Sequence, residues 1–107
     1  MEVIITAREQ FQTLTEPMYY ILLALLEPSC GVDVMQQVDK LSHGRVKVGP
    51  GTLYALLGKF EKEDMIREIE VVGRKRTYVI TPKGKKALKE EYKRLLILVE
   101  DGEFYFK

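Results

Sequence analysis

The sequence predicts a mainly α-helical domain with one small β-hairpin. Apolar residues recur at helical spacing in three segments, 32–41, 51–63 and 82–101. Two short runs with partly alternating residues flank the glycine at position 73, which is typical of a hairpin. The chain has 107 residues, of which 46% are hydrophobic and 31% charged, so it fits one globular domain.

The first predicted helix begins at Thr15 and ends before Pro28. Thr15 is a suitable N-cap, Glu16 adds an acid to the first turn, and Pro17 fits the first helical position. The run MYYILLALLE that follows is apolar nearly all round, so we expect this helix at the centre of the fold. A further short helix is predicted over residues 4–12.

A second helix is predicted over residues 32–41, after a turn at 29–31. Its apolar residues Val34, Val38 and Leu41 follow spacings of four and three, which places them in one stripe. We expect this stripe to face the core.

The third predicted helix opens with the string Gly-Pro-Gly-Thr at 49–52 and runs to about residue 63. Its core face is formed by Leu53, Leu56, Leu57 and Phe60. A short extended stretch precedes it at 45–48, because Val46 and Val48 alternate with basic residues. Two helices joined by a compact turn have the layout of a helix-turn-helix.

Two strand candidates follow, at 66–72 and 76–80, and residues 73–75 form the tip between them. Tyr78 and Ile80 lie on one side of the second strand. A hairpin directly after a helix-turn-helix is a wing, so we expect a winged helix-turn-helix.

The last predicted helix begins at Thr81, runs to Asp101 and stops at Gly102. Residues 95–99 are apolar on every side, and one small domain cannot cover them all, so we expect a second copy of the chain to do so. The alternative is that this helix folds back on the first one. The expected dimer interface consists of Leu88, Tyr92, Leu95, Leu96 and Val99.

Positive charge is concentrated in one part of a chain whose net charge is only +1. Residues 45–86 hold 11 basic and 5 acidic residues, and the remaining residues hold 6 basic and 11 acidic ones. This distribution is typical of a nucleic-acid-binding surface, although a solvated surface can show it too.

The outward face of the third predicted helix carries small residues. Opposite its core face lie Gly51, Ala55, Gly58 and Lys62. Small side chains let a helix approach a surface closely, either the major groove of DNA or a helix of another protein. Thr52 and Tyr54 near the helix N-terminus, and Lys59 one turn later, flank this line.

The wing favours DNA over a protein partner. Arg74, Lys75 and Arg76 crowd like charges at the hairpin tip, which contact with phosphates or a minor groove would explain. A solvated basic turn is the alternative for the tip, and a winged-helix protein-interaction module is the alternative function. The predicted DNA-binding residues are Lys47, Gly51, Thr52, Tyr54, Lys59, Arg74, Lys75 and Arg76.

We therefore divide the chain into residues 1–81, a winged helix-turn-helix DNA-binding domain with an N-terminal helix, and residues 82–107, a C-terminal dimerisation helix and tail. The expected partners are double-stranded DNA and a second copy of the chain.

No catalytic, metal or cofactor site is expected. His43 is the only histidine and stands in a polar loop, and Cys30 is the only cysteine. Neither has a neighbour at metal-ligand spacing. Glu90 and Glu91 lie among lysines, so we expect both on a solvated face.

A single cysteine excludes an intramolecular disulfide and favours a reducing compartment. The first residues lack the pattern of a signal peptide, and no apolar run is long enough to cross a membrane. These features predict a cytoplasmic protein.

Four strings together resemble the PadR family of bacterial transcriptional regulators: VGPGTLYALL at 48–57, FEKE at 60–63, GRKRTY at 73–78 and TPKG at 81–84. The resemblance implies a two-fold dimer on a pseudo-palindromic operator, usually as a repressor, and the short length resembles the short subfamily. It also implies DNA contacts by Thr52, Tyr54 and the three basic wing residues. Some relatives bind aromatic or drug-like effectors at the dimer centre, so such an effector is a further possible partner.

The chain departs from the family pattern at several positions. Ala55 stands where proline is common, Asp64 replaces a common glycine, and Cys30-Gly31-Val32 stands where a histidine-glycine-tyrosine run is frequent. The aromatic tail at 104–106 could line a pocket, extend the dimer contact or be disordered, and the sequence does not choose between these.

Overall fold

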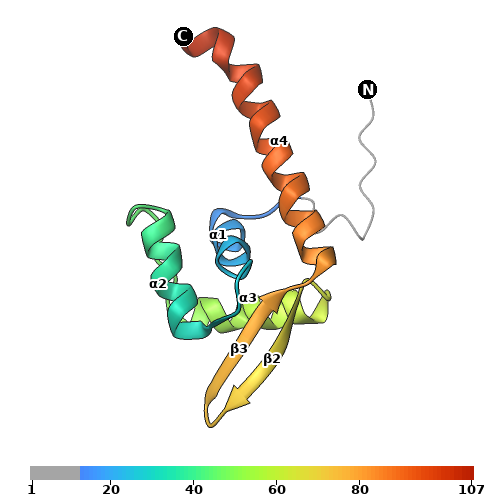
Figure 1. Cartoon of the computed structure of the whole chain (residues 1–107). Helices are drawn as coiled ribbons and strands as arrows, with labels where there is room; N and C mark the ends of the chain where they lie inside the picture. The colour runs from blue at the N-terminus through green and yellow to red at the C-terminus, as the bar shows by residue number, and fades with distance from the viewer. Residues whose placement is uncertain (1–12) are drawn as a thin grey trace.

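The computed structural model describes residues 13–107. Its elements in chain order are α1 (Glu16–Ala24), β1 (Ser29–Cys30), α2 (Gly31–Leu41), α3 (Pro50–Lys62), β2 (Ile66–Val72), β3 (Lys75–Ile80) and α4 (Pro82–Phe106) (Figure 1). Helices α2 and α3 followed by the β2–β3 hairpin form a winged helix-turn-helix, which confirms the predicted fold class. The helix predicted over residues 4–12 lies outside the described residues.

Helix α1 is central, as predicted. Oγ1 of Thr15 accepts a hydrogen bond from the N–H of Met18 at 3.4 Å and so caps the helix. Ile21 and Leu22 are fully buried, and α1 lies between α2 and α4 in Figure 1. The helix ends at Ala24, ahead of Pro28.

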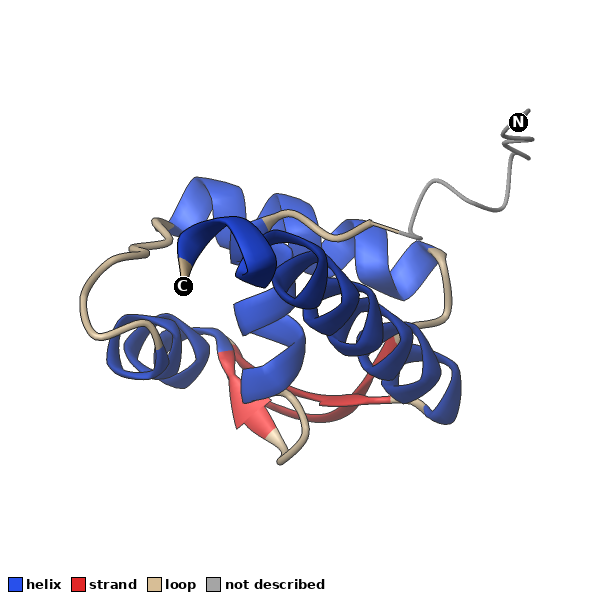
Figure 2. Cartoon of the chain, turned by 90° about the horizontal axis from the view of Figure 1, so that it is seen from above, coloured by secondary structure: helices blue, strands red, loops and turns tan. Residues whose placement is uncertain are grey.

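The predicted turn at 29–31 is wrong, because Ser29 and Cys30 form strand β1. Ser29 pairs with Tyr78 and Cys30 with Thr77, so the antiparallel sheet has the order β1-β3-β2. Two residues are too few to show a strand pattern, and only pairing with β3 makes this segment a strand. The sheet lies along one side of the helices (Figure 2).

Strands β2 and β3 form the wing. Their register runs from Ile66 opposite Ile80 to Val72 opposite Lys75, with one bulge in β2. Gly73 at the tip has a φ of 61°, a conformation that favours glycine. The tip needs only two residues, so β3 begins at Lys75, one residue earlier than predicted.

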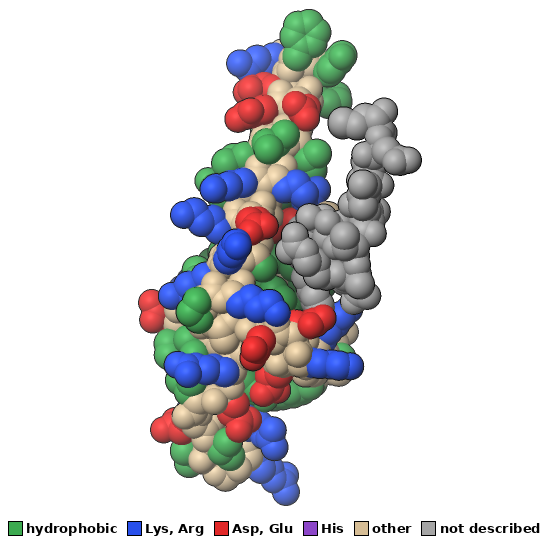
Figure 3. All heavy atoms as spheres, turned by 90° about the vertical axis from the view of Figure 1, so that its right-hand side faces the viewer, with side chains coloured by type: hydrophobic (Ala, Val, Ile, Leu, Met, Phe, Trp, Pro, Cys, Tyr) green, Lys and Arg blue, Asp and Glu red, His purple; other side chains and the backbone are tan. Residues whose placement is uncertain are grey.

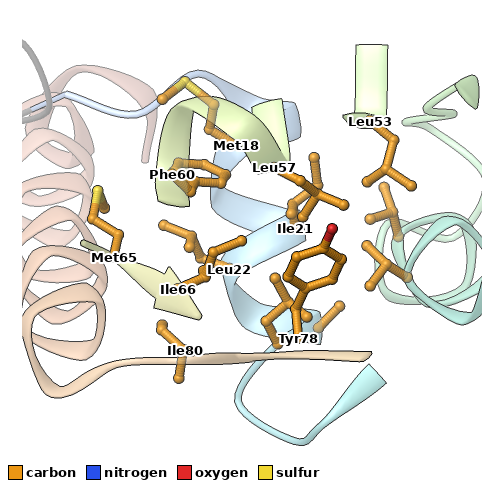
Figure 4. Close-up of a cluster of buried hydrophobic side chains, with 14 of the residues drawn as sticks. Met18, Ile21, Leu22, Leu53, Leu57, Phe60, Met65, Ile66, Tyr78 and Ile80 are labelled. Carbon is orange, nitrogen blue, oxygen red and sulfur yellow. The ribbon is translucent and has the colours of Figure 1, made fainter. Parts of the chain in front are cut away.

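The hydrophobic core lies where α1 and α3 meet the base of the wing, which is the end of the hairpin at Ile66 and Ile80 (Figure 4). Leu53, Leu57 and Phe60 on α3 are buried, as predicted, and Tyr78 and Ile80 cover the core from the sheet. Each such large apolar side chain contributes about 1.5–3 kcal/mol on burial.

Some predicted core positions are more exposed than expected. Leu56 is only half-buried, and Leu41 is 41% exposed because it is the last residue of α2, where the chain turns into the next loop. Residues 45–48 form no strand in the described structure, although Val48 is buried.

Helix α4 extends to Phe106, so the predicted stop at Gly102 is wrong. A glycine inside a helix costs about 1 kcal/mol relative to alanine, which does not by itself end a helix. Gly102 also lacks the positive φ that a glycine helix cap adopts. Within residues 13–107, no helix has the length and apolar character that a membrane span requires.

The start of α4 is fixed tightly to the base of the wing. Oγ1 of Thr81 accepts a hydrogen bond from the N–H of Gly84 at 3.0 Å and donates one to the carbonyl of Asp64 at 2.6 Å. Gly84 lies so close to the carbonyl oxygen of Met65 that no Cβ atom fits there. A glycine is therefore required at this position.

Candidate nucleic-acid interface

The outward face of α3 is open, as predicted. Gly51, Ala55 and Gly58 are exposed, and a Cβ atom built on either glycine would meet no other atom within 4 Å. Thr52 and Lys62 are also exposed. A flat or grooved partner could therefore approach the backbone of α3 along this line.

A groove of about 340 Å³ joins α3 to the wing. Its walls bring together residues that are distant in the sequence, namely Tyr54, Leu57, Gly58 and Glu61 of α3 with Arg74, Arg76 and Tyr78 of the wing. Two predicted DNA-binding residues of the wing, Arg74 and Arg76, thus meet one of α3, Tyr54, beside Gly58 of the small outward line.

Lys75 is separated from its two arginine neighbours. Side chains alternate across a strand, so Arg76 shares a face of β3 with the buried Tyr78, and Lys75 belongs to the other face. Arg74 and Arg76 line the groove, and Lys75 does not. The prediction treated the three as one cluster, whereas the strand pleat separates Lys75 from Arg76, and Arg74 lies in the turn before β3.

Acidic residues accompany the basic ones. Nη1 of Arg76 forms an ion pair with Oε2 of Glu68 at 3.3 Å, and the Glu68 side chain is only 28% exposed. That oxygen is buried and has no hydrogen-bond partner among the described residues. Figure 3 shows basic side chains at the wing end of the molecule with acidic ones close by.

Burial of Tyr78 raises the pKa of its hydroxyl, and the nearby carboxylate of Glu61 raises this pKa further. Sequence reasoning missed both residues as parts of the groove. The signals were available, since Glu61 is one turn after Gly58 on the same face of α3, and Tyr78 is two residues after Arg76.

The two remaining predicted DNA-binding lysines lie outside the groove. Lys47 is in the loop between α2 and α3, and its Nζ forms an ion pair with Oδ1 of Asp39 at 3.4 Å. Lys59 is exposed on α3.

The outer half of α4 carries an apolar surface. Its exposed residues include Tyr92, Leu96, Ile97, Leu98 and Val99, and the three aromatic residues at 104–106 are at least 77% exposed. Leu95 is half-buried. Exposed apolar side chains in this number on a protruding helix are typical of an interaction site.

One expectation for α4 is wrong, and another stays a prediction. Leu88 is only 6% exposed and packs in the core of its own chain, so its place in a dimer interface stays a prediction. Glu91 is 1% exposed rather than solvated, and Arg94 one turn later supplies its counter-charge, with Nε 2.9 Å from Oε1. This carboxylate raises the pKa of Arg94.

The isolated titratable residues do not form a site with one another. His43 lies in the α2–α3 loop with a φ of 55°, and Cys30 is half-buried in β1. Across residues 13–107 there is no cluster of three or more histidine, cysteine, aspartate or glutamate residues that could hold a metal ion.

A family model described as the transcriptional regulator PadR-like family matches residues 21–90. This chain is also similar to an uncharacterized 37.1 kDa protein in transposon TN4556 of Streptomyces fradiae, with 33% identity over 72 residues, or 66% of this chain. The chain spans only 20% of the length of that curated relative.

Solved structures of two regulators are similar to this fold. One is a transcriptional regulator from Clostridium thermocellum, with a TM-score of 0.70 and 18% identity, covering 95% of this chain and 100% of that one. The other is a PadR-like transcription factor from Bacteroides fragilis, with a TM-score of 0.67 and 28% identity, covering 83% of this chain and 87% of that one.

Proposed function

The chain belongs to the PadR-like family of transcriptional regulators, which are DNA-binding proteins and not enzymes, and on this premise we propose that it is a homodimeric repressor. It binds a pseudo-palindromic operator in duplex DNA, in the cytoplasm. The observation that carries the DNA contact in this proposal is the groove that Arg74 and Arg76 line together with Tyr54 and Gly58 of α3.

Helix α3 enters the major groove. The exposed small residues Gly51, Ala55 and Gly58 let its backbone approach the base edges closely. Thr52 and Tyr54 stand near the helix N-terminus, which is the part of a recognition helix that contacts bases.

The wing and the flanking lysines hold the DNA backbone. Arg74 and Arg76 contact phosphates or the minor groove beside α3, and Lys75 reaches the backbone from the other face of the wing. Lys47, in the loop before α3, and Lys59, on α3 itself, add phosphate contacts. These residues provide affinity that does not depend on sequence, whereas α3 provides specificity.

Residues 1–81 form the DNA-reading unit, and residues 82–107 form the dimerisation helix and tail. The apolar surface of α4, centred on Leu96 and Val99, packs on a second copy with support from Tyr92 and Leu95. Residues 82–94 hold six basic and two acidic residues, and residues 95–106 hold three acids and no base. An antiparallel pair of α4 helices therefore places opposite charges side by side.

A small aromatic effector fits the same dimer centre. The exposed rings of Tyr92 and of residues 104–106 offer flat apolar surfaces for stacking. Such a molecule would release the protein from its operator, which a screen of aromatic compounds against the operator complex can test.

The test is selection of bound sequences from a random duplex pool by the purified protein at near-physiological salt. We expect an enriched palindrome whose half-sites lie about 34–36 Å apart, or one helical turn. In vitro transcription from a promoter that carries this operator should then fall when protein is added. No enrichment, together with no duplex binding at low salt, would favour the protein-interaction module instead.

The dimer is tested by sedimentation of the variant Leu96→Glu with Val99→Glu. We expect a folded monomer, because two charges cannot be buried in an apolar interface without large cost. Lys40→Glu, an exposed change on α2, is the control and should leave the dimer intact.

A further inference from the structure

The first residue of α2 is a buried glycine that lies beneath a tyrosine of α3. A Cβ atom built on Gly31 would lie 2.6 Å from Oη of Tyr54, 3.0 Å from Cζ and 3.2 Å from Cε1. The end of the Tyr54 ring therefore occupies the space that any side chain at position 31 would need.

The contact involves only the free end of a movable side chain. The three atoms nearest to the built Cβ all belong to Tyr54, a residue that is 52% exposed and lines the groove. Gly31 does not adopt a positive φ, so its backbone also suits an alanine. A methyl group at position 31 can thus be accommodated if the Tyr54 ring swings outward.

Folding alone does not explain a glycine at this position. Glycine lowers helix stability relative to alanine, by up to about 1 kcal/mol in a helix interior and by less at the first residue, so alanine would not weaken α2. This situation differs from that of Gly84, where backbone atoms leave no room for a side chain.

We propose that Gly31 is a positioning residue for DNA recognition. Its missing side chain lets the Tyr54 ring lie against the first turn of α2, which fixes the ring at the groove wall opposite Arg74 and Arg76. A side chain at position 31 moves the ring away from this wall and weakens operator binding without unfolding the protein. The inference rests on the proposed function, in which Tyr54 contacts DNA.

A double-mutant cycle tests it on the full chain with the selected operator. Gly31→Ala should keep or raise the melting temperature and weaken operator binding about 10-fold, the ratio that corresponds to about 1.4 kcal/mol. In a Tyr54→Ala background, Gly31→Ala should change the affinity no further. Gln37→Ala, an exposed change on the same helix α2, is the matched control and should leave operator affinity unchanged.

Three results would overturn the proposal. The first is an equal loss of operator affinity from Gly31→Ala in the wild type and in the Tyr54→Ala background. The second is a loss of affinity in Gly31→Ala that is accompanied by a lower melting temperature. The third is a Tyr54→Ala variant that binds the operator as tightly as the wild type.

The position of the ring is tested without DNA. An NMR cross-peak between the Gly31 α-protons and the Tyr54 ring protons is expected in the free protein, and in Gly31→Ala the cross-peak from the remaining α-proton at position 31 to the ring should weaken. Absence of this cross-peak in the wild type overturns the positioning. Its presence in a wild-type protein that binds no duplex refutes the proposed function instead.

Discussion

Replacing Arg74 and Arg76 together by glutamine removes the two cations that face α3 across the groove. Both residues are exposed on the wing and lie outside the core, so the fold should persist. Glutamine keeps an extended side chain that can donate hydrogen bonds, so the change acts mainly on charge.

The expected result is a weaker dependence of DNA binding on salt. Each cation that neutralises a phosphate contributes about 0.9 to the slope of log K against log salt, so four cations in a homodimer contribute about 3.6. Between 50 and 200 mM salt, this difference makes the loss of wild-type affinity about 150-fold greater than that of the variant.

The assay is fluorescence anisotropy with a labelled operator duplex at several salt concentrations. Lys86→Gln with Lys93→Gln removes the same charge from exposed positions on α4 and should leave the slope close to that of the wild type. An unchanged slope in the arginine variant would refute the wing contact. An equal change in the control would show that net charge, and not the groove, sets the salt dependence.

Three further perturbations follow from single contacts. Glu68→Gln frees Arg76 from its ion pair, and at about 0.5–1 kcal/mol for each of the two pairs in a homodimer it should tighten duplex binding about 5- to 30-fold; weaker binding in the same anisotropy assay would contradict this. Gly84→Ala forces a methyl group against the carbonyl of Met65 and should lower the free energy of unfolding in urea by about 3 kcal/mol or more, whereas a loss below 1 kcal/mol would count against the close contact. Burial raises the pKa of Tyr78, so the folded state favours the protonated phenol. Its contribution to the free energy of unfolding should therefore be fully present below about pH 10 and decrease as the pH rises further. Tyr78→Phe should reduce that fall in pH-dependent denaturation, and an unaltered pH dependence would exclude Tyr78 as its source.

Features that depend on neighbouring residues in the chain could be predicted from the sequence. Thr15 and Thr81 both cap helices because their hydroxyls reach N–H groups three residues later, a purely local geometry. The core face of α3 also follows from spacing alone, since Leu53, Leu57 and Phe60 recur along one side of a helix.

Features set by distant residues could not be predicted in the same way. Ser29 and Cys30 form a strand only because β3 lies alongside them. Glu91 is buried by the packing of α4, and no pattern of charges in its own segment indicates this. Arg74 and Arg76 line the groove and Lys75 does not, and this difference likewise depends on the strand register and on the position of α3 beside the wing.

The contact between Gly84 and the carbonyl of Met65 has a consequence for the operator. This contact holds the start of α4 against the residue that precedes β2. In a dimer held by α4, the α4 helix and the wing of each subunit would therefore move together as one rigid body. The crossing angle of the two α4 helices would then set the distance between the two α3 helices. Substitutions on α4 could therefore change the preferred spacer between half-sites, and operator architecture could evolve without altering a single residue that reads bases.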